Sequence, residues 1–98
     1  MRERRLAQLV ADLQPFVPGL MPFQVEEVAQ VIGEQWDAMA AMRQQARENG
    51  AVTRPGEILR RAREMTDEKL YAILSPPQLE AFRLWRETRF GSPESVAR

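Results

Sequence analysis

The stretch from Leu74 to Gln78 carries the most specific structural signal in the chain. Ser75 is a favoured N-cap because its hydroxyl accepts a backbone N–H that would otherwise lack a partner. Pro76 suits the first helical position, where its missing N–H costs nothing. Gln78 stands three residues after the cap, so its amide can reach back to the N–H of Ser75 and complete a capping box. The stretch therefore predicts the end of one helix, a tight joint and the start of another.

Apolar residues elsewhere recur at the three- and four-residue spacing of amphipathic helices, and no stretch alternates with the two-residue period of a strand. Proline or glycine stands at most of the expected boundaries. We expect an all-α protein with four helices over about 2–14, 22–49, 55–74 and 76–90. All 98 residues form one domain, with an N-terminal helix and proline-rich link over 1–19, a helical body over 20–90 and a flexible polar tail over 91–98.

The sequence also supports specific predictions for several residues within these segments. Phe16 and Val17, in the proline-rich link, should enter the core. Gly33 costs about 1 kcal/mol relative to Ala inside a helix, unless a neighbouring helix packs closely there. Thr66-Asp67 offers an internal capping signal, but the apolar spacing favours an uninterrupted third helix. The basic residues Arg2, Arg4 and Arg5 are expected on the solvent side of the first helix.

Composition argues against catalysis and against a cofactor. The chain contains no His and no Cys, which are among the commonest general bases, nucleophiles and metal ligands. The carboxylate pairs Glu26-Glu27 and Asp67-Glu68 are adjacent in helices, so their side chains point in different directions. Met39 and Met42 share a face and could bind a soft ion such as Cu(I), but methionine at this spacing is far more often a packing residue. We therefore expect a non-enzyme without a metal site or a cofactor.

Charge and hydropathy exclude two further classes of partner. The 14 basic residues balance 14 acidic ones, so the chain lacks the surplus positive charge typical of nucleic-acid-binding proteins. No apolar stretch is long enough to cross a bilayer. The Leu6–Val10 run after the charged N-terminus is too short for the core of a signal peptide. The protein is expected to be periplasmic if a signal peptide has been removed, and otherwise cytoplasmic.

The stretch Leu20-Met21-Pro22-Phe23-Gln24 repeats the pattern of residues 74–78, since both read Leu-x-Pro-x-Gln. Each stands immediately before an apolar helical stripe, which suggests a repeated device for starting a helix. Leu, Pro and Gln are also common at helix starts, so the pattern alone does not separate such a device from coincidence. Met21 lacks a hydroxyl, so the first of the two helices is expected to be capped differently.

With these two stretches the chain resembles the Spy/CpxP family of small periplasmic stress proteins, which carry a repeated LTxxQ motif. The second copy is the closer match, because Ser75 keeps the capping hydroxyl of the family's Thr, whereas Met21 departs from it. The resemblance covers about residues 20–88 and implies a long helical hairpin, often in a curved antiparallel dimer, and a periplasmic location. The motif and capping positions are Leu20, Pro22, Gln24, Leu74, Ser75, Pro76 and Gln78.

A thin four-helix protein of this length cannot cover every apolar stripe internally, so we expect a homodimer, with binding of client proteins as a second use of the uncovered surface. Each residue in these sets is, taken alone, more often core or solvated surface than binding site. The candidate partner-binding or dimer face consists of Trp36, Met39, Met42, Met65 and Trp85. The candidate basic rim, suited to acidic clients, consists of Arg60, Arg61, Arg63, Arg83, Arg86 and Arg89.

Two functions follow from these expectations. The leading one is an ATP-independent holdase-type chaperone, or a stress-response accessory, that captures apolar segments of client proteins. The alternative is a periplasmic-type sensor or regulatory subunit that binds one specific protein partner in a metal- or stress-linked response. A plain helical structural module is a third possibility.

Overall fold

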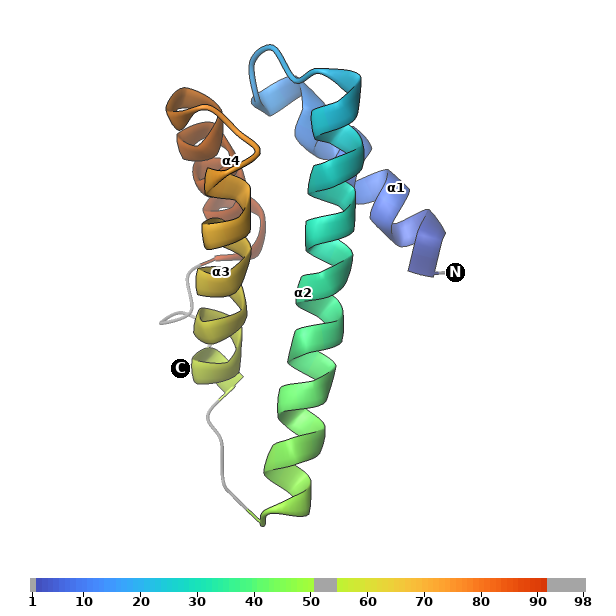
Figure 1. The fold of residues 1–98 in the computed structure, drawn as a ribbon, viewed down its shortest axis with the longest axis vertical. Helices are drawn as coiled ribbons and strands as arrows, with labels where there is room; N and C mark the ends of the chain where they lie inside the picture. The colour runs from blue at the N-terminus through green and yellow to red at the C-terminus, as the bar shows by residue number, and fades with distance from the viewer. Residues whose placement is uncertain (1, 51–54, 92–98) are drawn as a thin grey trace.

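The computed structural model describes residues 2–50 and 55–91, and every regular element in these two ranges is a helix. Residues 51–54, between the second and third expected helices, and residues 92–98 of the expected tail lie outside the described residues. The all-α prediction and the order of its four helices are confirmed (Figure 1). The elements are α1 (Arg2–Leu13), a short 3-10 helix η1 (Gln14–Phe16), α2 (Pro22–Glu48), α3 (Pro55–Tyr71) and α4 (Pro76–Phe90).

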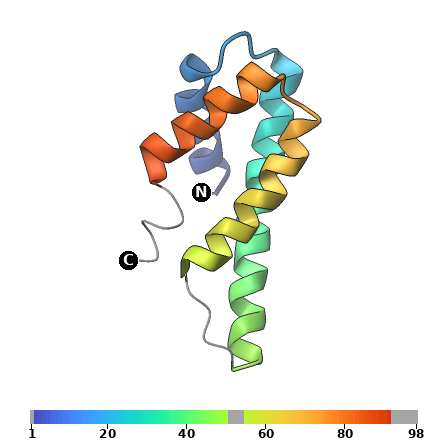
Figure 2. The same ribbon diagram turned by 90° about the vertical axis from the view of Figure 1, so that its left-hand side faces the viewer.

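Helices α2 and α3 form a long antiparallel hairpin (Figure 1). Helices α1 and α4 lie over one end of this hairpin, where α2 begins and α3 ends, and Figure 2 shows both on the same side of it. The far end of the hairpin extends beyond both of them. The molecule measures 45 × 26 × 23 Å, and its radius of gyration of 14.1 Å exceeds the value of about 13 Å expected for a compact chain of this length. The long hairpin therefore leaves part of its surface uncovered.

The core lies at the end where all four helices meet. It joins residues far apart in the sequence, which makes this end the part of the molecule that holds the helices together. Full burial of one large apolar side chain is worth about 1.5–3 kcal/mol. The buried members are Val10, Leu13, Val17, Val28, Val31, Ile32, Leu70, Leu74, Phe82 and Trp85.

Helix α3 ends earlier than the apolar spacing predicts. It runs without interruption through Thr66-Asp67, as expected, but stops at Tyr71 instead of residue 74. The N–H of Leu74 donates to the carbonyl oxygen of Leu70 at 2.8 Å, which tightens residues 72–74 into a turn. Ser75 is extended, with φ −68° and ψ 160°, because a residue before proline avoids the helical region.

Only one of the two apolar residues that the sequence places in the core from the proline-rich link is buried there. Val17 is buried in the core, as expected. Phe16 is 63% exposed, so its assignment to the core is wrong. It belongs to the single turn η1, none of whose residues is buried, whereas Val17 directly after this turn enters the core.

Gly33 marks the place where α1 packs closely against α2. The guanidinium Nη2 of Arg2 donates to the carbonyl oxygen of Gly33 at 2.6 Å. A Cβ on Gly33 would lie 3.3 Å from that nitrogen and 3.8 Å from a methyl group of Leu6. This close approach is the condition under which a glycine inside a helix is accommodated. It also fixes the position of the N-terminal end of α1 on α2.

Candidate functional site

The two Leu-x-Pro-x-Gln stretches form matching helix starts. The N–H of Ser75 donates to Oε1 of Gln78 at 3.0 Å, and the N–H of Met21 donates to Oε1 of Gln24 at 2.9 Å. Ser75 Oγ accepts the N–H of Gln78 at 3.4 Å, which completes the predicted capping box of α4. Met21 has no hydroxyl to give the equivalent bond. Helix α2 is therefore capped through the Gln24 side chain and without a hydroxyl, as the sequence predicts.

The two glutamines also contact each other. Nε2 of Gln24 donates to Oε1 of Gln78 at 3.0 Å and to the carbonyl oxygen of Ile73 at 3.1 Å. Nε2 of Gln78 donates to the carbonyl oxygen of Pro18 at 2.9 Å. Both side chains are buried and hydrogen-bonded at both ends of the amide, as buried polar groups require. We call this arrangement the glutamine junction; its role is structural, since it joins the starts of α2 and α4.

A groove with a volume of about 1040 Å³ is lined by residues of all four helices. Its lining residues on α2 recur at helical spacing and so form one face of that helix. The apolar residues of the groove are Leu9, Ile32, Trp36, Met39, Leu59, Phe82, Trp85 and Phe90. The polar ones are Gln8 and Gln35, together with the arginines Arg2, Arg4, Arg5, Arg43, Arg63, Arg86 and Arg89.

The groove lining is basic although the chain has a formal net charge of zero, and three of its seven arginines pair with aspartates just outside the lining. Half of the 14 basic residues of the chain line it, and no aspartate or glutamate is among the described lining residues. Both tryptophans of the chain line it as well. The groove thus combines an aromatic and aliphatic surface with a concentration of guanidinium groups.

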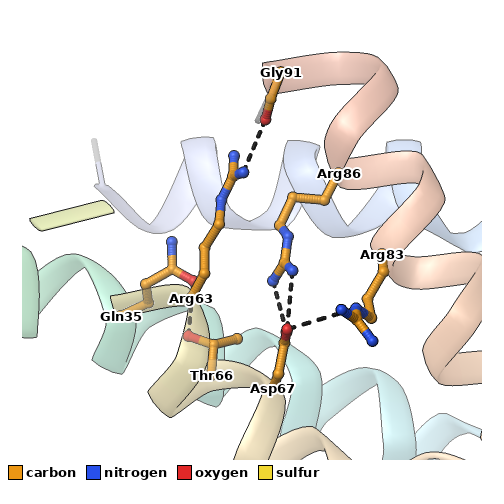
Figure 3. A network of polar contacts seen from close by, with 7 residues as sticks. All are labelled: Gln35, Arg63, Thr66, Asp67, Arg83, Arg86 and Gly91. Carbon is orange, nitrogen blue, oxygen red and sulfur yellow. Dashed lines mark hydrogen bonds and ion pairs between the residues drawn. The ribbon is translucent and has the colours of Figure 1, made fainter. Parts of the chain in front are cut away.

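Two of these arginines hold α4 against α3 (Figure 3). Arg86, whose side chain is 10% exposed, makes a bidentate pair with Asp67 at 2.7 and 3.0 Å. Arg63 Nη1 donates to the carbonyl oxygen of Gly91 at 2.8 Å, at the C-terminal end of α4. Arg83 approaches the same Asp67 at 3.7 Å from outside the groove. A bidentate guanidinium–carboxylate pair fixes geometry as well as charge, so it sets the position of α4 along the groove.

Three further arginines lie over the tryptophan rings. The guanidinium carbons of Arg2 and Arg5 are 5.8 and 5.9 Å from the ring centroid of Trp36, and that of Arg89 is 5.9 Å from Trp85. These distances are typical of cation–π contacts. Arg2 and Arg89 also pair with the carboxylates of Asp37 and Asp12, at 2.6 and 3.0 Å. These contacts order the cationic side chains around the aromatic surface.

Arg4 and Arg43 differ from the other arginines of the groove. Neither forms an ion pair, a hydrogen bond or a ring contact with any residue in the described ranges. Both are exposed. Their guanidinium groups are therefore available to a negatively charged group that enters the groove.

Two exposed ion pairs tie the helices together beside the groove. The guanidinium of Arg2 lowers the pKa of the Asp37 carboxyl through a hydrogen bond, and the ammonium of Lys69 lowers the pKa of the Glu34 carboxyl in the same way. The first pair joins α1 to α2, and the second joins α2 to α3. Both carboxyl groups therefore stay ionised at neutral pH.

The groove brings together some of the residues singled out from the sequence. Of the apolar candidates it includes Trp36, Met39 and Trp85, and of the basic candidates Arg63, Arg86 and Arg89. Met42 lines a smaller depression between the end of α2 and the start of α3. Met65 is exposed and lies outside both hollows. Arg60, Arg61 and Arg83 lie outside the groove, and Arg61 pairs with Glu57 along α3.

The contribution of the first helix was missed. Arg2, Arg4 and Arg5 are exposed, as the sequence predicts, and they also line the groove together with Leu9. The same spacing that aligns Arg2 and Arg5 with Leu9 on one face was the available signal. It does not indicate which neighbouring helix that face meets.

Comparison with family models, with curated proteins and with solved structures finds no match for this chain. No helix within the described ranges is both long enough and apolar enough to cross a membrane.

Proposed function

We propose that this protein is a non-enzymatic binding protein that captures apolar segments of client proteins in the groove, as an ATP-independent holdase-type chaperone or stress-response accessory. The observation that carries the proposal is the groove of about 1040 Å³, with eight apolar residues, two of them tryptophan, beside seven arginines. Protein–protein interfaces are enriched in aromatic residues, methionine and arginine in the same way. The arginines give the apolar surface a charged surround that keeps it hydrated when no client is bound.

The groove is suited to clients of differing shape. Trp36 and Trp85 offer large planar apolar surfaces, and Met39 has a flexible, polarizable side chain that can repack around different partners. The frame around these residues is held by the Arg86–Asp67 pair and by the glutamine junction. A preformed frame reduces the ordering cost of binding.

The resemblance to the Spy/CpxP family supports the same proposal by analogy. Both motif copies meet in the glutamine junction, which gives the repeated pattern a common structural role in this chain. On this analogy the proposal includes a periplasmic location and a homodimer. The uncovered end of the α2–α3 hairpin, which carries Met42, is the surface proposed for the dimer contact (Figure 2).

Suppression of aggregation tests this proposal. A chemically denatured client protein is diluted into buffer without ATP and with increasing molar ratios of this protein, and light scattering is followed. We expect scattering to fall with the ratio, and the Met39→Gln variant to be weaker, because it makes the groove lining polar. Met65→Gln is the matched control on exposed surface outside the groove. Undiminished scattering at a molar excess of the protein would overturn the holdase proposal.

The alternative function is a sensor or regulatory subunit with one specific protein partner in a stress- or metal-linked response. The concentration of arginine in a single groove favours it, because fixed charges select partners of complementary charge. Saturable binding of one partner, without protection of unrelated denatured proteins, would support this alternative over the holdase.

A further inference from the structure

We infer that the groove recognises an acidic amphipathic helix, a protein segment whose apolar stripe is flanked on both sides by carboxylates. This inference rests on the proposed binding function and names the chemistry of the preferred occupant. Laying the apolar face of a helix in an apolar groove is a common mode of peptide recognition. In this protein the apolar groove also carries positive charge, which its arginines contribute.

Charge complementarity is the first argument. The groove is lined by seven arginines and by no described aspartate or glutamate, in a chain whose formal net charge is zero. A segment flanked by lysines would place like charges against these guanidinium groups. A segment flanked by carboxylates would instead form charge-assisted, partly bidentate hydrogen bonds with them.

The distribution of the charges is the second argument. The basic lining residues come from separate helices, including Arg4 and Arg5 on α1, Arg43 on α2 and Arg89 on α4. An anionic amphiphile with a single headgroup, such as a fatty acid, would meet only one of these positions. A helix with carboxylates on both sides of its apolar stripe can meet several of them together.

The length of the groove is the third argument. Its lining residues on α2 run from Ile32 to Arg43, a distance of about 16 Å at 1.5 Å per residue. This length matches about three turns of a bound helix. Trp36 and Met39 lie within this span and would contact the apolar stripe.

The availability of charge is the fourth argument. Arg2, Arg86 and Arg89 already pair with carboxylates of this chain. Arg4 and Arg43 do not pair with any described residue, and both are exposed. They lie on different helices, so an incoming helix that carries several carboxylates can pair with both.

Three synthetic peptides test the inference on the full chain. They share one apolar stripe over about three to four helical turns, contain no Trp or Tyr, and carry Glu, Gln or Lys at the flanking positions. The emission of Trp36 and Trp85, the only tryptophans in the chain, reports binding in the groove. We expect the Glu peptide to bind about tenfold more tightly than the Lys peptide at low salt, with a smaller ratio at high salt.

Two double variants with the same change in charge provide the control. R4Q/R43Q removes the two arginines of the groove that make no ion pair, hydrogen bond or ring contact with any described residue, and R47Q/R60Q removes two exposed arginines outside the groove. We expect the preference for the Glu peptide to fall several-fold in the first variant and to persist in the second. Circular dichroism verifies that both variants remain folded. Equal losses in the two variants would assign the effect to overall charge and overturn the inference.

The outcomes separate this inference from the holdase proposal. Equal binding of the three peptides would overturn acid recognition and leave apolar capture standing. Preference for the Glu peptide without suppression of aggregation would overturn the holdase and support the inference. Absence of peptide binding, with aggregation still suppressed, would place capture outside the groove and overturn the inference. Tighter binding of dodecanoate or of a single-stranded oligonucleotide than of the Glu peptide would also overturn it.

Discussion

Gln24 and Gln78, 54 positions apart in the sequence, are joined by a buried amide–amide hydrogen bond of 3.0 Å while each accepts the backbone N–H at the start of its own helix. The bond links two capping devices that would otherwise act locally. Whatever disturbs one helix start therefore also disturbs the other.

Replacement of Gln78 by alanine tests the strength of the glutamine junction. It removes the bonds of Gln78 to Gln24, to the N–H of Ser75 and to the carbonyl oxygen of Pro18, and it leaves buried polar groups without partners. We expect the free energy of unfolding to fall by about 2–3 kcal/mol. Urea unfolding followed by circular dichroism measures this. Gln44→Ala, at an exposed position of α2 where Gln44 bonds to Glu48, is expected to cost less than about 0.5 kcal/mol.

Replacement of Met21 by threonine supplies the hydroxyl that the first motif copy lacks. Met21 has the extended backbone of an N-cap, with φ −80° and ψ 154°, and its side chain is exposed. A threonine hydroxyl at this position can accept a backbone N–H of the first turn of α2. We expect the free energy of unfolding, measured by thermal unfolding, to rise by about 0.5–1 kcal/mol. Met21→Val has the same branched shape without the hydroxyl, and an equal gain from it would contradict capping as the cause.

Replacement of Asp67 by asparagine tests whether the Arg86–Asp67 ion pair holds α4 against α3. Asp67→Asn leaves the guanidinium of Arg86, which is almost fully buried, without its carboxylate. We expect the free energy of unfolding to fall by about 2–4 kcal/mol. Tryptophan emission should shift to the red, because Trp85 is the residue next to Arg86 on α4. Glu57→Gln breaks the exposed Arg61–Glu57 pair and is expected to cost less than about 1 kcal/mol. Similar losses in the two variants would contradict a special role for the buried pair.

Stability should depend on pH only at the acid end. The chain has no His or Cys, so we expect little change in the free energy of unfolding between about pH 5.5 and 8. Arg2 and Lys69 lower the folded-state pKa of Asp37 and Glu34, so the stability these carboxyls add is complete above their unfolded pKa of about 4. It is lost as pH falls through the lower folded-state pKa.

Chemical unfolding at a series of pH values measures this dependence. The D37N/E34Q variant should be less stable at neutral pH and should lose less of its stability on acidification. A loss centred near pH 6 in the wild-type protein would contradict the assignment, because neither carboxyl titrates there.

The proposed homodimer is tested by light scattering over a dilution series. We expect a mass of twice 11.3 kDa, because the far end of the α2–α3 hairpin is not covered by α1 or α4 (Figure 2). Met42→Glu places a charge in the depression at that end and should shift the equilibrium toward the monomer. A monomer at all concentrations would remove the dimer from the proposal and favour the regulatory alternative.

The sequence predicted the helices well because their signals are local. Proline at the first position of α2, α3 and α4, and the Ser75–Gln78 capping box, determine where these helices start. The end of α3 was placed three residues too late, because apolar spacing continues through the turn that Leu74 closes onto Leu70. Phe16 was misplaced because an apolar residue in a short link does not show by itself which side faces the core.

The groove was only partly predictable. Trp36, Met39 and Trp85 were found because large apolar residues at helical spacing are evident in a sequence. The arginines of α1 were not, because their location depends on how α1 packs over α2 at Gly33. That packing is set by contacts between distant residues, which helical periodicity does not contain.

The glutamine junction also bears on the order in which the molecule forms. The bond closes a segment of 54 residues, and the entropy of closing so long a loop is lost before the contact is gained. The α2–α3 hairpin needs shorter closures and buries apolar surface earlier. We therefore expect the junction to form after the folding transition state, so that it slows unfolding without accelerating folding. In this role the two glutamines set the rate of unfolding, and with it the lifetime of the folded molecule.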